Sequence, residues 1–118
     1  MRFLCLYKSA KPEGTPPAEK EMAEMGKLIE DWMKSGKLLA TEGCLPSALG
    51  ARVRLSKGKF NVVDGPFTES KEAVAGYILL RVTDLDAATE VAKECPGLDF
   101  GMSVEIRPIS EELGRGPD

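Results

Sequence analysis

Carboxylates, a phenol and a few cationic groups are the residues of this chain that could support chemistry. Asp64 stands directly before Gly65 and Pro66. A carboxylate at the end of a strand can be partly desolvated, which raises its pKa toward the range useful for proton transfer. An Asp-Gly pair is also typical of a plain turn, in which the side chain bonds nearby backbone amides. We keep both interpretations of Asp64, a catalytic general base and a turn former.

Further charged groups are expected near Asp64. Glu42 precedes Gly43 in an otherwise apolar stretch, and Glu69 and Lys71 follow the Asp64 turn. Convergence of these groups at one end of a sheet would form a ligand-binding cluster, in which Lys71 would hold an anionic small molecule. The alternative for Glu69 and Lys71 is a solvated surface or the first turn of a helix.

Three more polar residues are expected to share one face of a sheet. Tyr77 could donate a hydrogen bond to a ligand, and the guanidinium groups of Arg81 and Arg107 could clamp a carboxylate. Their alternative role is in hydrogen bonds and ion pairs between the two subunits of a homodimer. These residues suit binding, but they form no catalytic set that stands alone, so the sequence leaves open whether the chain is an enzyme.

Composition narrows the classes of function. The chain has no histidine, and its three cysteines lack C-x-x-C spacing, so we expect no metal site and no cofactor. Sixteen basic residues against nineteen acidic ones give a net charge of −3, which argues against a nucleic-acid partner. The first apolar run stops at Lys8, too early for a signal peptide or a membrane span, so we expect a cytoplasmic protein without membrane association.

The elements that must position these residues follow from periodicity and turn signals. Two helices are predicted, one from Pro16 after a Thr15 cap to Gly36, and one from an Asp84 cap to Pro96. Strands are predicted for residues 2–8, 51–56, 59–63, 76–83 and 102–107, with Lys57-Gly58 as a hairpin turn. Residues 38–47 are predicted to form a short strand that runs into a turn.

This order predicts an α+β, ferredoxin-like β-α-β-β-α-β fold with an added β-hairpin that extends the sheet. Both helices should cover one face and leave the other bare. On the bare face we expect Phe3, Cys5, Tyr7, Tyr77, Leu79, Arg81, Glu105 and Arg107. Its apolar middle suits a second copy of the chain. We therefore expect a homodimer of a single domain, residues 1–109, followed by a polar, partly disordered tail, residues 110–118.

The segment VDGPFTESKE at residues 63–72, with Gly76-Tyr77 after it, resembles the DGPF segment, typically DGPFAETKE, of one branch of the YCII-related proteins. The resemblance runs from the first strand through Glu42-Gly43 and Leu45-Pro46 to residues 104–108, with Ser70 where threonine is usual. It implies a dimeric α/β barrel with a pocket between the sheet and inserted loops. Family members are often encoded beside alternative sigma factors, which implies a regulatory setting.

The resemblance also implies an enzymatic possibility. YCII relatives outside this branch use a His-Asp pair, and a few eliminate chloride from ring compounds, whereas this chain has no histidine. Three hypotheses follow: a small-molecule-binding dimeric domain with a regulatory role, a lyase- or isomerase-type enzyme with Asp64 as general base, and a protein–protein interaction module.

Overall fold

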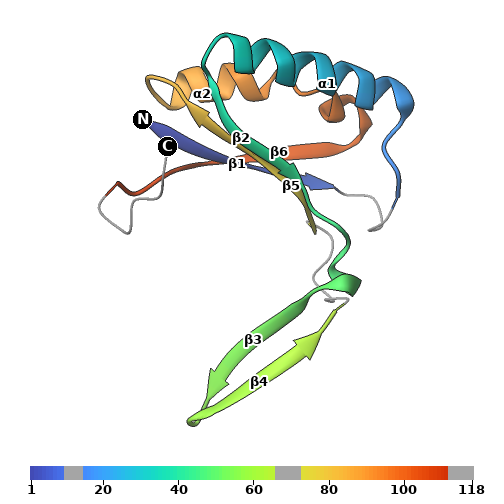
Figure 1. The fold of residues 1–118 in the computed structure, drawn as a ribbon, viewed down its shortest axis with the longest axis vertical. Coiled ribbons are helices and arrows are strands. Elements are labelled where there is room, and N and C mark those ends of the chain that lie inside the picture. Colours follow the sequence, from blue (N-terminus) through green and yellow to red (C-terminus); the bar gives the residue numbers. More distant parts are fainter. Residues whose placement is uncertain (10–14, 66–72, 112–118) are drawn as a thin grey trace.

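The structure is a computed structural model that describes residues 1–9, 15–65 and 73–111 (Figure 1). Four antiparallel strands form one sheet in the order β2-β5-β1-β6. The bounds of these strands are β1 Arg2–Ser9, β2 Leu38–Gly43, β5 Ala73–Arg81 and β6 Met102–Pro108. The strand order and the two helices between strands fit the predicted ferredoxin-like α+β fold.

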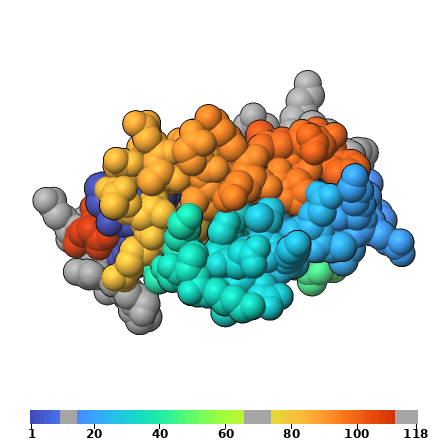
Figure 2. All heavy atoms as spheres, turned by 90° about the horizontal axis from the view of Figure 1, so that it is seen from above, coloured from blue at the N-terminus to red at the C-terminus, as the bar shows by residue number. Residues whose placement is uncertain are grey.

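Helices α1 (Glu19–Lys34) and α2 (Leu85–Ala92) lie side by side over the same face of the sheet (Figures 1 and 2). The predicted Asp84 cap of α2 is confirmed, because its side chain accepts a hydrogen bond of 2.8 Å from the Ala87 N–H. The predicted end of α1 is also confirmed, since Gly36 adopts a left-handed φ of 78°.

The start of α1 was predicted too early. The helix begins at Glu19, with Ala18 in an extended conformation before it, rather than at Pro16. The run Thr15-Pro16-Pro17 explains the difference, because a residue that precedes proline is disfavoured in the helical region. This places the first turn of α1 three residues further along the chain.

The hydrophobic core lies between the sheet and the two helices. Because paired residues of antiparallel strands point to the same face, Cys5 shares the helix-covered face with its partners Ile78 and Ile106. The core comprises Phe3, Cys5, Trp32, Leu38, Ile78, Leu80, Ala88, Val91 and Cys95.

The prediction for the bare face was therefore wrong for Phe3, Cys5 and Tyr7. Phe3 and Cys5 are each only 1% exposed, beneath the helices, and Tyr7 packs against the same core. The error lies in the assignment of faces. Both sets of alternate residues in β1 are apolar, so the sequence alone does not show which set faces the helices.

The bare face instead takes the alternate residues of β1. Its apolar middle consists of Leu4, Leu6, Tyr77 and Leu79, because Leu4 lies opposite Leu79 and Leu6 lies opposite Tyr77. All four are half-buried in the single chain. The predictions for Tyr77 and Leu79 thus agree with the register.

The predicted hairpin forms, but it does not extend the sheet. Strands β3 (Ala51–Ser56) and β4 (Lys59–Asp64) pair only with each other, and we call residues 51–64 the arm. Its Lys57-Gly58 turn has positive φ at both residues, 50° and 76°, as predicted for a two-residue hairpin turn. The arm projects from the sheet on the side opposite the helices (Figure 1).

The two ends of the described chain meet beside β1. Ile109 N donates a hydrogen bond to Arg2 O, and the Arg2 guanidinium contacts the Glu111 carboxylate at 3.0 and 3.3 Å. Of the predicted tail, Ser110 and Glu111 are described, and residues 112–118 lie outside the described residues. No helix in the described part of the chain is long and apolar enough to cross a membrane.

Truncation of Leu80 tests the core. Leu80 is 1% exposed, so Leu80→Ala should lower the free energy of unfolding by about 2–5 kcal/mol through lost burial and a residual cavity. Leu85→Ala is the matched control, because Leu85 is 49% exposed, and it should cost about 1 kcal/mol or less. Urea denaturation at one protein concentration measures both, and equal losses would contradict this core.

Candidate functional site

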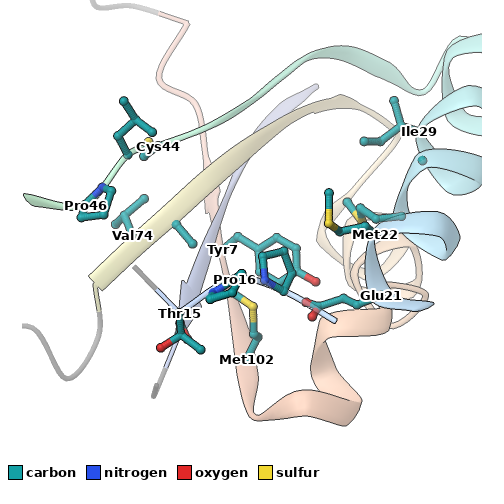
Figure 3. A pocket seen from close by; sticks show the side chains of 16 residues that line it. Tyr7, Thr15, Pro16, Glu21, Met22, Ile29, Cys44, Pro46, Val74 and Met102 are labelled. Carbon is teal, nitrogen blue, oxygen red and sulfur yellow. The ribbon is translucent and has the colours of Figure 1, made fainter. Parts of the chain in front are cut away.

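A cavity of about 580 Å³ lies between the first half of α1, the adjoining ends of β1 and β5, and the segment that follows β2 (Figure 3). This volume is in the usual range for a small-molecule pocket. The wall is largely apolar and includes Met22, Met25, Ile29, Leu45, Val74 and Met102.

Tyr7 and Glu21 place two polar groups at the inner wall of this cavity. Tyr7 comes from the helix-covered face of β1, and Glu21 comes from the first turn of α1, where the positive end of the helix dipole favours a carboxylate. Glu21 is only 6% exposed. The phenol oxygen and the carboxylate point toward one another (Figure 3).

Gly97 is the third member of this group. Its backbone N–H donates a hydrogen bond of 2.9 Å to the Tyr7 hydroxyl. A Cβ atom on Gly97 would overlap that hydroxyl and lie 2.8 Å from Glu21 Oε1. Glycine at this position therefore lets both oxygens approach the backbone of η3 (Pro96–Phe100).

The environment of Tyr7 keeps its phenol protonated. Burial raises the pKa of Tyr7 to about 12, and the neighbouring Cys95 and Glu21 act in the same direction. The hydrogen bond from Gly97 acts against them. At neutral pH Tyr7 is therefore a neutral group that already accepts one hydrogen bond and keeps its own proton to donate.

The charge of the described cavity lining is negative. Among the described lining residues Glu21 is the one with a charged side chain, and none is lysine or arginine. An anion would meet the Glu21 carboxylate without a compensating cation from these residues. The predicted anionic ligand depended on Lys71, which lies outside the described residues, as does Glu69.

The other predicted ligand-binding residues gather on the bare face rather than in the cavity. Glu42 lies opposite Tyr77 across β2 and β5, and Arg81 and Arg107 belong to the same face by register. Glu42, Arg81 and Arg107 are exposed, and Tyr77 is half-buried. The predicted common face of Tyr77, Arg81 and Arg107 agrees with the register, and Glu42, which was predicted near Asp64, joins them there. None of these four residues is among the described residues that line the cavity.

Glu105 links two cations on this bare face. Lys8 Nζ lies 2.9 Å from Glu105 Oε1, and Arg107 Nη1 lies 3.5 Å from Oε2. The hydrogen bond and charge of Lys8 hold the pKa of Glu105 below its usual value, with a smaller effect from Arg107. Arg107 therefore has a partner within the same chain.

Asp64 ends β4 at the base of the arm and is exposed. It lies opposite Ala51 in the arm and is not among the described residues that line the cavity. Gly65 N donates a hydrogen bond of 3.1 Å to Gly50 O, which closes the base of the arm. This bond joins the backbones of Gly65 and Gly50, and both interpretations of Asp64 stay predictions.

Sequence reasoning missed Tyr7 and Glu21 as site residues. Tyr7 was assigned to the wrong face of β1, and Glu21 was not among the candidate residues. Helical spacing was a usable signal for Glu21. Glu21 lies one turn before Met25 and two turns before Leu28 and Ile29, and these three apolar residues pack against the core.

Cys44 is exposed at the rim of the cavity, whereas the other two cysteines are buried in the core. Burial raises the pKa of Cys5 to about 11 and that of Cys95 to about 12. Both thiols are therefore buried and protonated at neutral pH, which makes them poor nucleophiles.

Comparisons with known proteins place this site in context. The YCII-related domain matches residues 1–112. An uncharacterized protein of Rhizobium meliloti (strain 1021) is 30% identical over 93 residues, 78% of this chain and 75% of that protein. The 5-chloro-2-hydroxyhydroquinone dehydrochlorinase of Burkholderia phenoliruptrix AC1100, solved with 2,5-dihydroxybenzoquinone, has a TM-score of 0.51 and 14% identity, over 93% of this chain and 94% of that one. The last similarity concerns the fold.

Thiol labelling tests the description of the three cysteines. In the native protein near pH 8 only Cys44 should react rapidly with a disulfide reagent, because the other two thiols are buried and protonated. Cys44→Ser should remove the rapid phase, and unfolding in guanidinium chloride should expose the remaining thiols. Rapid labelling of a second cysteine in the native protein would contradict this arrangement.

Proposed function

The chain belongs to the family of YCII-related domains, and we propose that it is a small-molecule-binding domain that works as a homodimer. The observation that supports this function best is the apolar cavity with Tyr7 and Glu21 at its inner wall. We further propose membership of the DGPF branch, from the segment that begins at Asp64. A regulatory role, through occupancy of this cavity, belongs to the same proposal.

The polar pair defines the chemistry of the ligand. The Tyr7 hydroxyl already accepts a hydrogen bond from Gly97, so it offers its proton to an acceptor, while the Glu21 carboxylate accepts from a donor. A ring with a hydroxyl group beside a second oxygen satisfies both, and methionine sulfur makes favourable contacts with aromatic rings. We therefore propose a neutral, ring-shaped ligand of this kind, such as a substituted catechol.

A lyase- or isomerase-type enzyme is the second candidate. The observation that favours it is the shared fold with a dehydrochlorinase whose solved complex holds a dihydroxybenzoquinone. In such an elimination a base removes a proton as chloride leaves, so HCl is lost without an oxidant. Asp64 is our proposed base from the sequence; Glu21 is the carboxylate that the described cavity offers instead.

Binding of 4-methylcatechol under reducing conditions tests the first candidate. Calorimetry should detect binding to the wild type, and Glu21→Gln and Tyr7→Phe should each weaken it by roughly ten-fold, because each removes one hydrogen-bonding partner. Glu24→Gln is the matched control, since Glu24 lies one turn from the cavity pair and contacts Lys20. Benzoate, an anion of similar size, should bind more weakly.

Equal effects of Glu21→Gln and Glu24→Gln on binding would contradict the role of the cavity pair. Tighter binding of benzoate than of 4-methylcatechol would contradict the neutral ligand class. Protection of Cys44 from the labelling reagent by bound ligand gives an independent readout, because Cys44 lies at the cavity rim.

Chloride release from 5-chloro-2-hydroxyhydroquinone tests the enzymatic candidate. If Asp64 is the general base, Asp64→Asn should lower the rate by about 100-fold or more, while Glu21→Gln acts mainly through substrate binding. Abolished release in Glu21→Gln with an unchanged rate in Asp64→Asn would contradict Asp64 as the base. A wild type without chloride release above buffer would count against this candidate and leave the binding proposal intact.

A further inference from the structure

The Tyr7 hydroxyl and the Glu21 carboxylate are close neighbours without a hydrogen bond between them. A Cβ atom on Gly97 would meet both the hydroxyl and Glu21 Oε1, so the two oxygens lie beside the same point of the backbone. The hydroxyl accepts its hydrogen bond of 2.9 Å from the Gly97 N–H, and no described residue donates one to the carboxylate. The cavity thus holds a donor and an acceptor side by side, and both are available to a ligand.

Burial leaves the Glu21 carboxylate in need of a donor. Glu21 is only 6% exposed, and its carboxylate lies at the inner wall of a largely apolar cavity (Figure 3). Burial of an acceptor without a donor costs free energy, which a ligand with a hydroxyl group recovers. The apolar wall fits the ring of such a ligand, and the absence of lysine and arginine from the described lining fits a neutral one.

Proton transfer at carbon requires the same pair of groups. Removal of a proton from a carbon beside a carbonyl needs a base at the C–H bond and a donor at the carbonyl oxygen, close to each other. Burial raises the pKa of Tyr7 to about 12, so the phenol keeps its proton at neutral pH. The hydrogen bond from the Gly97 N–H polarises this hydroxyl and makes it a better donor.

We propose that the cavity catalyses the keto–enol isomerisation of a neutral cyclic α-hydroxy ketone, with Glu21 as the base and Tyr7 as the donor to the carbonyl oxygen. This inference rests on the proposed small-molecule function of the same cavity. It differs from the elimination considered above, because no group leaves the substrate and the base belongs to the cavity.

The reaction balances without an oxidant or a second reactant. Glu21 removes the proton from the ring carbon that bears the hydroxyl group. The C–H electron pair forms a C=C bond, and the carbonyl electron pair moves to the oxygen at Tyr7. The carbon proton then returns to the former carbonyl carbon, while the hydroxyl proton passes to the former carbonyl oxygen, so the carbonyl moves by one position.

The net charge of the cavity stays constant in this reaction. As Glu21 takes up the proton, its negative charge passes to the substrate oxygen at Tyr7. A new charge in a site that is poor in water would be costly, whereas a shift between neighbouring oxygens creates none. The site therefore needs no cation from its described lining.

The catechol ligand resembles the intermediate of this reaction. The intermediate is an enediol, with two hydroxyl groups on adjacent trigonal carbons, and a catechol carries the same two groups on a ring. A compound that resembles a reactive intermediate binds more tightly than the substrate does. 4-Methylcatechol should therefore inhibit the isomerisation competitively and bind more tightly than the ketone.

Racemisation of (R)-2-hydroxy-1-tetralone in deuterated water tests the proposal, with deuterium uptake at the carbon that bears the hydroxyl group as the second readout. The wild type should accelerate both well above buffer. Glu21→Gln should lower the rate at saturating ketone by about 100-fold or more, and Tyr7→Phe by about 100-fold. Glu21→Asp, which keeps a carboxylate, should retain more activity than Glu21→Gln. The matched control Glu24→Gln should react at the wild-type rate.

The outcomes separate this reaction from the binding function. A wild type that binds 4-methylcatechol but racemises the ketone no faster than buffer would overturn the reaction and leave the binding proposal intact. A wild type that neither binds nor reacts would overturn both. Equal rates for Glu21→Gln and Glu24→Gln would overturn the role of Glu21 as the base.

Discussion

The pairing of β1 with both of its neighbours is the constraint on which the rest of the structure depends. Cys5 lies opposite Ile78 on β5 and Ile106 on β6, so the central strand has one possible division of its side chains. Phe3, Cys5 and Tyr7 go beneath the helices, and Leu4, Leu6 and Lys8 go to the bare face. A shift of one residue would exchange the two sets and remove Tyr7 from the cavity. Core, cavity and bare face are therefore three consequences of a single register.

The cavity pair depends in addition on a close approach at Gly97. The short η3 helix after α2 brings the Gly97 backbone against the Tyr7 hydroxyl, and the side chain of Trp32 on α1 donates a hydrogen bond of 3.1 Å to Glu94 just before η3. These contacts join α1, β1 and the segment after α2 at one corner of the molecule. The apolar side of α1 packs against the core, and its Trp32 is only 3% exposed. This packing holds α1 in place and so positions Glu21 at that corner.

The sequence predicted the element types and their order well, because turn residues and periodicity are local signals. Interactions within a few residues determine three of these features: the Asp84 cap, the end of α1 at Gly36 and the Lys57-Gly58 turn. Register and long-range contacts are different. Both faces of β1 are apolar, so nothing local told Phe3 from Leu4, and the approach of Gly97 to Tyr7 joins residues 90 positions apart. Tyr77, Arg81 and Arg107 lie on one face as predicted, whereas Glu42 was predicted near Asp64, and the cavity pair depends on contacts that the sequence does not show.

Gly65, which follows Asp64, has a structural role at the base of the arm, and this role does not depend on whether Asp64 is catalytic. The cavity rim at Cys44 and Pro46 continues directly into η1 (Ser47–Leu49), and the arm follows after Gly50. At the return of the arm, Gly65 N bonds Gly50 O, and a Cβ on Gly65 would overlap the Ser47 carbonyl. The glycine after Asp64 is thus required by backbone packing at the joint between rim and arm. Because Cys44 N is also bonded to Ala75 O at 2.7 Å, the rim is tied both to β5 and to the arm. The entrance of the cavity is therefore held by backbone contacts that involve both β5 and the base of the arm.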